Sequence, residues 1–372
     1  MRNLTNALYS VAQIRAIEAS ARKFLKSDKS LMELAGQEAY SCLRQCWPSV
    51  SRVVVLCGGG NNGGDGFVLA RLAQNAGLSV CLVLAAKPST SEAEEALNKA
   101  LAAGVVASSF SEAALVEADL IVDALLGIGF SGKVREPFRT IMLSVNRQVK
   151  PVFSLDVPSG LDADSGRISQ VAITADVTMS FIGLKRGLFM SKARDVAGHI
   201  VFKPLIAGHL SVHDDFWATC LSDQWIENVR PTRHNSFHKG DAGHVGVVGG
   251  FRGMPGAVAL SGLAALRSGA GRVTVGCFPD NAESVAAMSP ELMVKPLMTD
   301  DDVHQLLESV DVAVIGPGLG LTDWSKKIFH HSIQTAVPKV VDADALTLLE
   351  ANRQVLTDAV LTPHPGEAAR ML

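Results

Sequence analysis

The sequence predicts an α/β fold, with a doubly wound parallel sheet in the first part of the chain and a second α/β series after it. Short apolar runs rich in β-branched residues alternate with helical stretches, an order typical of parallel strands joined by helical crossovers. A strand, a glycine loop and a helix follow one another at residues 52–66, and this succession returns at residues 244–257. The 372 residues exceed one ordinary domain of about 100 to 200 residues, so two domains are expected.

Two helices are expected to open the chain. Ser10 with Gln13, and Ser30 with Glu33, have the spacing of a capping box, and apolar residues after Ser30 recur at helical spacing. The elements predicted next are a strand at residues 52–57, a helix at 66–76 and strands at 78–85, 119–125, 150–156 and 176–181.

Residues 204–241 have no regular apolar rhythm and are predicted to form an irregular connection. A second series follows, with strands expected at residues 244–249, 272–277, 311–315, 338–341 and 360–361. We therefore expect one domain at residues 1–210, a connection at 211–240 and a further domain at 241–372.

Charge and apolar content exclude several classes of protein. The 34 Lys and Arg residues nearly balance 37 Asp and Glu, so the chain lacks the excess of basic residues that is typical of proteins that bind nucleic acid or an anionic membrane. The N-terminal residues lack the apolar core of a secretory signal, and no apolar run is long enough to span a bilayer. We expect a soluble cytoplasmic protein with six free thiols. The sequence does not decide whether the protein forms a homo-oligomer.

The glycine loop Gly58-Gly-Gly-Asn-Asn-Gly-Gly-Asp-Gly66 lies between a predicted strand and a predicted helix. It matches G-x-G-x-x-G, but residues 84–88 lack the acid that would hold a ribose, so an ordinary NAD-dependent dehydrogenase is disfavoured. Asn61, Asn62 and Asp65 instead offer oxygen atoms to a polar ligand or a hard cation. A tight turn that needs positive φ angles is the alternative interpretation.

Asp123 and Asp156 each stand at the end of a predicted strand. Because the carboxyl ends of parallel strands gather at one edge of a sheet, we expect both to converge with Asn62. Two carboxylates there could share a cation, or one could transfer protons. A structural cap is the alternative for a single strand-end aspartate.

Five motifs in the first part of the chain carry a resemblance to a known family: GGGNNGGDGFVLAR, LIVDALLGIGFSG, SLDVPSGL, FIGLKRGL and SKARDVAG. In this order, over residues 10–203, they resemble the N-terminal module of the bifunctional NAD(P)H-hydrate repair enzymes. The resemblance implies a Rossmann-like domain that interconverts the R and S forms of NADH or NADPH hydrated on the nicotinamide ring, abbreviated NAD(P)HX.

The resemblance also implies a set of site residues. Potassium would be bound by Asn62, Asp123 and Ser159. The hydrated dinucleotide would be held by Asn61, Asn62, Gly63, Gly64, Asp65, Gly127, Ile128, Gly129, Phe130, Ser131, Gly132, Lys133 and Asp156. For the chemistry we hypothesise Asp156 as the acid and base, with Lys185 as a second polar partner. A solvated charge is the alternative for Lys185.

The second part of the chain carries further glycine-rich motifs at strand ends, among them GGFRGMPGA, GPGLG and TPHPGE. Together they resemble the first part of the ribokinase-like ADP- or ATP-dependent NAD(P)H-hydrate dehydratase, which would use the nucleotide with Mg²⁺. By that likeness Ala257, Gly318 and His364 would contact the S-hydrate.

The family's Gly-x-Gly-Asp motif, which carries the catalytic aspartate of the dehydratase, is not found in residues 230–372. Phosphoryl-transfer chemistry needs this base and its anion-stabilising amides. We therefore expect an incomplete dehydratase domain, truncated at its C-terminal side, that is inactive unless the missing part is supplied separately.

Two other functions compete with this prediction. A non-catalytic ligand-binding or assembly module could keep the fold without the chemistry, but the intact set Asn62, Asp123, Asp156 and Ser159 favours an enzyme. The hypothesis of a small-molecule kinase of the ribokinase type rests on the second part of the chain alone. Such a kinase would need the Gly-x-Gly-Asp motif, which is not found there.

Overall fold

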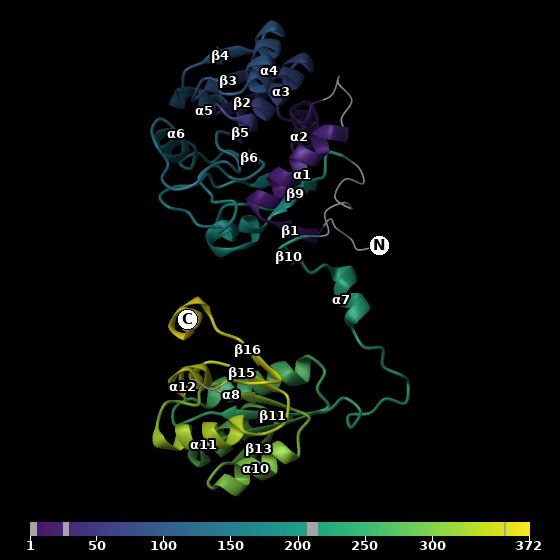
Figure 1. Cartoon of the computed structure of the whole chain (residues 1–372), viewed down its shortest axis with the longest axis vertical. Helices are drawn as coiled ribbons and strands as arrows, with labels where there is room; N and C mark the ends of the chain where they lie inside the picture. The colour runs from purple at the N-terminus through teal and green to yellow at the C-terminus, as the bar shows by residue number, and fades with distance from the viewer. Residues whose placement is uncertain (1–5, 25–29, 207–214, 353–354) are drawn as a thin grey trace. The chain divides into compact units, whose positions relative to one another are not determined.

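A computed structural model describes the chain except for residues 1–5, 25–29, 207–214 and 353–354. It divides into two compact units, Met1–Arg230 and Pro231–Leu372. Each unit contains a parallel sheet with helices around it (Figure 1), which confirms the predicted fold class. The division falls inside the predicted connection, and the boundaries at residues 210 and 240 stay predictions.

The first unit is built on a seven-stranded parallel sheet with the order β4-β3-β2-β5-β6-β7-β9. Its strands are β2 (Arg52–Cys57), β3 (Ser79–Leu84), β4 (Val106–Ser108), β5 (Leu120–Ala124), β6 (Val152–Leu155), β7 (Val177–Phe181) and β9 (His199–Lys203). The five predicted strands are confirmed. The two that were not predicted, β4 and β9, are the edge strands, whose residues are half-buried or exposed and so lack a long apolar run.

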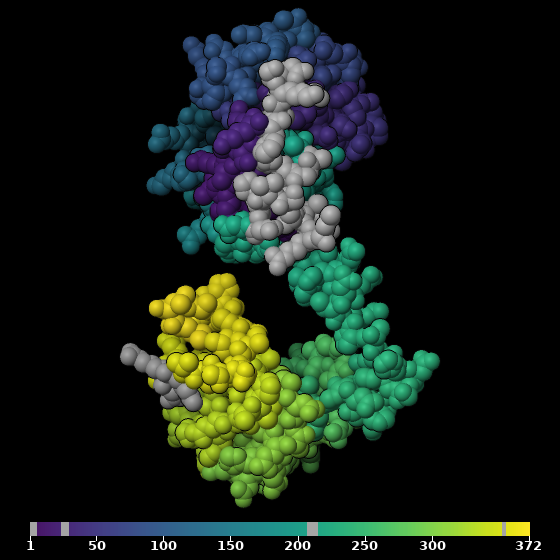
Figure 2. All heavy atoms as spheres, turned by 45° about the vertical axis from the view of Figure 1, so that its right-hand side comes forward, coloured from purple at the N-terminus to yellow at the C-terminus, as the bar shows by residue number. Residues whose placement is uncertain are grey.

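Helices cover both faces of this sheet. Alternate residues of β2 point to opposite faces, so Val53 and Val55 belong to one core cluster and Val54 and Leu56 to another. The first face is covered by α1 (Val11–Phe24), α2 (Leu31–Cys46), α3 (Asn61–Asn75) and α4 (Ser91–Ala102), and the second by α5 (Glu112–Glu117) and α6 (Phe138–Val145). Purple and blue atoms of the N-terminal helices form much of the face of the first unit seen in Figure 2.

A small second sheet in the first unit was not predicted. Its strands are β1 (Ala7–Tyr9), β8 (Leu184–Lys185) and β10 (Ala218–Thr219), and two 3₁₀ helices follow β8, η2 (Arg186–Phe189) and η3 (Ser191–Asp195). Strands this short give no periodicity to recognise. Their pairing places Tyr9 opposite Lys185 and so fixes the backbone at that lysine.

The second unit holds a six-stranded parallel sheet with the order β13-β12-β11-β14-β15-β16. Its strands are β11 (His244–Gly249), β12 (Arg272–Cys277), β13 (Met293–Pro296), β14 (Val312–Ile315), β15 (Lys339–Val341) and β16 (Ala359–Leu361). The helices are α8 (Pro255–Arg267), η5 (Pro279–Asn281), α9 (Ala282–Met288), α10 (Asp300–Glu308), α11 (Asp323–Ile333), α12 (Asp344–Asn352) and α13 (Pro365–Met371). Five strands were predicted, and β13, at the edge, was missed. One helix in the predicted connection, α7 (Asp223–Val229), belongs to the first unit.

The capping predictions hold at the first helix and in part at the second. The Ser10 N–H donates to Gln13 Oε1 at 2.8 Å, and the Gln13 N–H donates to Ser10 Oγ at 3.3 Å. Ser30 Oγ accepts from the Glu33 N–H at 3.1 Å, but the Glu33 carboxylate pairs with Arg71. None of the described helices is long and apolar enough to cross a membrane.

The predicted start of the third helix is wrong, because α3 begins at Asn61 rather than at residue 66. The glycines there serve close packing instead of a turn. A Cβ atom on Gly63 would lie 2.0 Å from the Gly58 carbonyl oxygen, and one on Gly66 would lie 2.7 Å from both Ala124 Cβ and Cys57 Sγ. Glycine therefore lets the first turns of α3 lie directly on the strand ends, against its low helix propensity.

We expect Gly63→Ala to lower the free energy of unfolding by about 1 to 3 kcal/mol, the usual cost of overpacking. The added methyl group meets backbone, which cannot rotate away as a side chain can. Gly129→Ala is the matched control, since a Cβ atom there has nothing within 4 Å and no positive φ angle opposes it. Urea unfolding of both variants measures the difference, and equal stabilities would contradict the packing argument.

Candidate functional site

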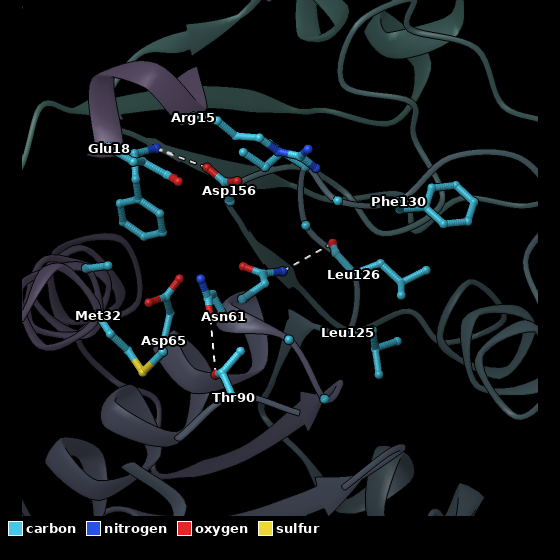
Figure 3. Close-up of a pocket in the computed structure, with 18 of the residues that line it drawn as sticks. Arg15, Glu18, Met32, Asn61, Asp65, Thr90, Leu125, Leu126, Phe130 and Asp156 are labelled. Carbon is cyan, nitrogen blue, oxygen red and sulfur yellow. Dashed lines mark hydrogen bonds between the residues drawn. The ribbon is translucent and has the colours of Figure 1, made fainter. Parts of the chain in front are cut away.

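A cavity of about 900 Å³ opens in the first unit at the carboxyl ends of its central strands (Figure 3). Of the residues predicted to hold the dinucleotide, those lining it are Asn61, Asn62, Asp65, Gly127, Ile128, Gly129, Phe130, Ser131, Gly132, Lys133 and Asp156. Gly63 and Gly64 are buried in α3 and do not line it. Of the other predicted residues, Asp123, Ser159 and Lys185 lie behind its wall, all buried. Most of the predicted set therefore lines one cavity, and its role in binding the dinucleotide stays a prediction.

Asp156 follows β6 directly and stands in a left-handed backbone conformation, with φ at 67°. Its N–H donates to the Met179 carbonyl at 2.7 Å. Its carboxylate accepts a hydrogen bond from the Phe181 N–H at 3.4 Å and pairs with the Lys185 ammonium group. An aspartate tolerates this strained conformation better than most residues, and the conformation turns its carboxylate into the pocket (Figure 3).

Lys185 is a buried cation, with a side chain only 1% exposed. Its Nζ has three acceptors: the Asp156 carboxylate, Ser180 Oγ at 3.3 Å and the Phe181 carbonyl at 2.7 Å. The alternative of a solvated charge is therefore wrong for this lysine. Because an ammonium group has three hydrogens, this arrangement satisfies it fully while it holds one carboxylate oxygen in place.

Asp123 lies at the end of β5 with no exposed surface. Its carboxylate accepts hydrogen bonds from Ser154 Oγ at 2.8 Å, from the Ser159 N–H at 2.8 Å and from Ser159 Oγ at 2.5 Å. Burial raises the pKa of the Asp123 carboxyl above its ordinary value, while the hydrogen bonds from Ser159 and Ser154 act in the opposite direction.

Asn62 reaches this cluster through the backbone at Leu126. Its Nδ2 donates to the Leu126 carbonyl at 3.2 Å, while its Oδ1 is buried without a hydrogen-bond partner among the described residues. Ser159 Oγ lies 3.2 Å from the same carbonyl and accepts from the Leu126 N–H at 2.8 Å. The Asn62 amide, the Leu126 carbonyl, the Ser159 hydroxyl and the Asp123 carboxylate therefore gather at the wall of the pocket. In the described residues no group of three or more His, Cys, Asp or Glu side chains could hold a metal ion.

Two further carboxyl groups face the pocket. Burial raises the pKa of Asp65 well above its ordinary value, and the negative charges of Asp156 and Glu18 add to the rise. Burial likewise raises the pKa of Glu18, followed by the charge of Asp156. Three acidic groups in one cavity repel one another, so the pocket favours a protonated carboxyl among them.

Sequence reasoning missed the part of the pocket wall that α1 and α2 supply. Arg15, Glu18 and Arg22 lie on one stripe of α1, beside the stripe of Ile14 and Ile17 that enters the core. The apolar wall from α2 consists of Leu31, Met32 and Ala35. The charged stripe repeats at positions i, i+3 and i+7, so a search for charges next to the apolar face could have found it.

In the second unit, the structure brings two of the three predicted contact residues together. A Cβ atom on Gly318 would lie 3.0 Å from the Ala257 Cβ atom. His364 follows β16, which β15 separates from the strand before Gly318. Its Nδ1 accepts from the Gly366 N–H at 3.0 Å and caps α13, so His364 has a structural role, and its contact with the hydrate stays a prediction.

Fold and site thus define a two-unit α/β protein with a cavity of ligand size at the carboxyl ends of the central strands of its first sheet. Residues 28–187 match the family described as YjeF-related protein N-terminus, and residues 245–372 match the NAD(P)H-hydrate dehydratase family. The bifunctional NAD(P)H-hydrate repair enzyme of Coxiella burnetii is 41% identical over 98% of this chain and 75% of that protein. Its counterpart in Escherichia coli is 42% identical over 92% of this chain and 67% of that protein.

The chain therefore belongs to the bifunctional NAD(P)H-hydrate repair enzymes. Among solved structures, the ADP/ATP-dependent NAD(P)H-hydrate dehydratase of Bacillus subtilis, co-crystallised with ATP and Mg²⁺, is 29% identical to it. That comparison covers 40% of this chain and 54% of that chain, with a TM-score of 0.35.

Proposed function

We propose that the first unit interconverts the R and S forms of hydrated NADH and NADPH. The observation that carries the proposal is the Asp156–Lys185 pair, a buried cation behind a carboxylate that opens on the pocket. Family membership supplies the substrate class. All the residues that line this pocket belong to the first unit.

In the proposed reaction, Asp156 exchanges a proton with the hydroxyl group of the hydrated ring. Inversion of a carbon that carries a hydroxyl beside a ring nitrogen requires one of its bonds, C–O or C–N, to open and close again. A carboxyl group at hydrogen-bond distance can give up and take back the proton in these steps. Lys185 acts as a positioning residue, because its three hydrogen bonds hold the carboxylate and leave no hydrogen for the substrate.

We further propose that Asn62, Asp123 and Ser159, with the Leu126 carbonyl, bind potassium. The unpartnered Asn62 Oδ1 supports the fit, because a buried amide oxygen needs a hydrogen-bond donor or a cation. The donor set consists only of oxygens, as a hard cation requires. When bound, potassium would supply a positive charge that balances the buried Asp123 carboxylate and steadies the loop after Leu126.

Potassium chloride is expected to raise the melting temperature above that in choline chloride at equal ionic strength. At a concentration of about 100 times Kd, the stabilisation would be about 2.7 kcal/mol. Asn62→Ala removes the unpartnered oxygen and should abolish the difference between the salts. Identical melting curves in both salts would contradict the site, and sodium chloride measures its selectivity.

For the second unit, we propose that a polypeptide of these 372 residues does not dehydrate the hydrates by itself. The support is the lack of a Gly-x-Gly-Asp motif in residues 230–372. Family membership relates this unit to dehydratases, for which ADP or ATP with Mg²⁺ is the proposed cofactor. Ala257 and Gly318 stay the proposed contacts for the S-hydrate, with His364 as a third.

One experiment tests both halves of this proposal. The chain is incubated with a purified mixture of the hydrate epimers, with and without ADP or ATP and Mg²⁺. Chromatography follows the two epimers, and absorbance follows restored NADH or NADPH. We expect epimer exchange without nucleotide and no restored absorbance with it. Absence of exchange would refute the epimerase, and nucleotide-dependent restoration would refute the proposed inactivity of the second unit.

A further inference from the structure

Two carboxyl groups enter the pocket from different elements. Asp156 comes from the end of β6 and Asp65 from α3, and both line the cavity. Figure 3 shows them on opposite sides of the open space, with the Asp65 carboxylate directed toward the side on which Asp156 lies. A flat ring bound between them would turn one face to each carboxyl.

The surroundings of these two carboxyls differ. Asp156 pairs with the Lys185 ammonium group, which holds one of its carboxylate oxygens in place. At Asp65, none of the described residues donates a hydrogen bond to the carboxyl. Burial and the charges of Asp156 and Glu18 raise its pKa well above the ordinary value. The two carboxyls therefore have unlike surroundings on opposite sides of the open space, as groups with different proton-transfer roles require.

If inversion breaks the C–O bond, it needs an acid on one face of the ring and a base on the other. The hydroxyl leaves as water after it takes a proton from an acid on its own face, and the nitrogen electron pair forms a C=N bond. Water then adds to the carbon from the other face, its electrons form the new C–O bond, and a base on that face takes its proton. The C=N electrons return to nitrogen, so atoms and charge balance when one proton has moved from acid to base.

We propose that Asp65 is the second proton-transfer group of the epimerase and works on the ring face opposite Asp156. In one direction Asp65 protonates the leaving hydroxyl and Asp156 accepts the proton of the entering water. In the other direction their roles are exchanged. This inference rests on the proposed epimerase function and extends it, because it assigns a group to each face and requires exchange of the hydroxyl oxygen with solvent.

Two measurements test the inference. The wild-type chain converts a single epimer in water enriched in oxygen-18, and mass spectrometry counts the label in the inverted product during the first turnovers. We expect one labelled oxygen per inversion, above a control without protein. Asp65→Asn keeps the size of the side chain but cannot transfer a proton, so its rate should fall by about 10²- to 10⁴-fold.

Glu92→Gln is the matched control for the variant. Glu92 also contributes negative charge at Asp65, yet it pairs with Arg22 and does not line the cavity. We expect its rate to stay within twofold of wild type. Asp65→Ser repeats the test if Asp65→Asn fails to fold, which thermal melting reveals.

The outcomes separate this inference from the proposed function. A wild-type chain that does not epimerise refutes both. A chain that epimerises without incorporating oxygen-18 keeps its function, but the C–O bond then stays intact and the two-face inference is overturned. Full activity of folded Asp65→Asn also overturns it. Label in the product together with a large loss of rate in that variant supports it.

Discussion

Asp156→Asn is expected to lower the epimerisation rate by about 10²- to 10⁴-fold and to leave the fold intact. The asparagine has nearly the same shape as aspartate and also tolerates the left-handed conformation at φ 67°. It can still accept a hydrogen bond from Lys185, but it cannot take up or release a proton at neutral pH. Initial rates from one pure epimer, together with a melting curve, measure the effect.

Asp358→Asn is the control for Asp156→Asn. Asp358 also has a positive φ angle, 52°, but it is exposed and lies in the second unit. The same chemical change there tests whether an asparagine at a left-handed position disturbs the protein in general. We expect wild-type activity for this control. Full activity of Asp156→Asn would remove Asp156 from the mechanism, whatever the control shows.

Lys185→Met is expected to lower the free energy of unfolding by about 2 to 4 kcal/mol, near the loss seen when one partner of a buried ion pair is removed. Methionine fills much of the same space but leaves Asp156, Ser180 Oγ and the Phe181 carbonyl without their donor. Asp156 keeps 14% of its side chain exposed to the pocket, so water reduces the loss. Epimerisation should fall as well, because the carboxylate is no longer held.

Lys203→Met is the control for this second prediction. Lys203 pairs with Glu38 at 2.9 Å on the surface, with side chains 38% and 41% exposed. A pair of this kind contributes about 0 to 1 kcal/mol, so the variant should be nearly as stable as wild type. If urea unfolding gave equal losses of unfolding free energy for Lys185→Met and Lys203→Met, burial of the Lys185 pair would not contribute to stability.

Much of the site could be predicted because parallel strands end at one edge of a sheet. Asp123 lies near the end of β5 and Asp156 follows β6, its neighbour in the sheet, while Asn62 comes after β2 on the other side of β5. Their convergence needs only the strand order of a doubly wound fold. The glycine loop misled the prediction of the helix start, since propensity counts glycine as a helix breaker while packing against Gly58 requires it.

Other parts of the site could not be predicted from local patterns. The burial of Lys185 depends on β8, a strand of two residues that pairs with β1 across most of the first unit's sequence. Arg15 and Glu18 recur at helical spacing, but this pattern does not show that they face a pocket, which depends on where α1 packs on the sheet. Long-range contacts of this kind leave no periodic signal in the sequence.

The central claim is that the first unit is an epimerase, and the time course of one pure epimer tests it most directly. The chain is mixed with the R-hydrate of NADH or NADPH, without nucleotide, and chromatography measures how fast the S-hydrate forms. We predict conversion to an equilibrium mixture well ahead of the spontaneous reaction, and no such gain with Asp156→Asn. Formation of the S-hydrate at the spontaneous rate with the folded wild-type chain would contradict the claim.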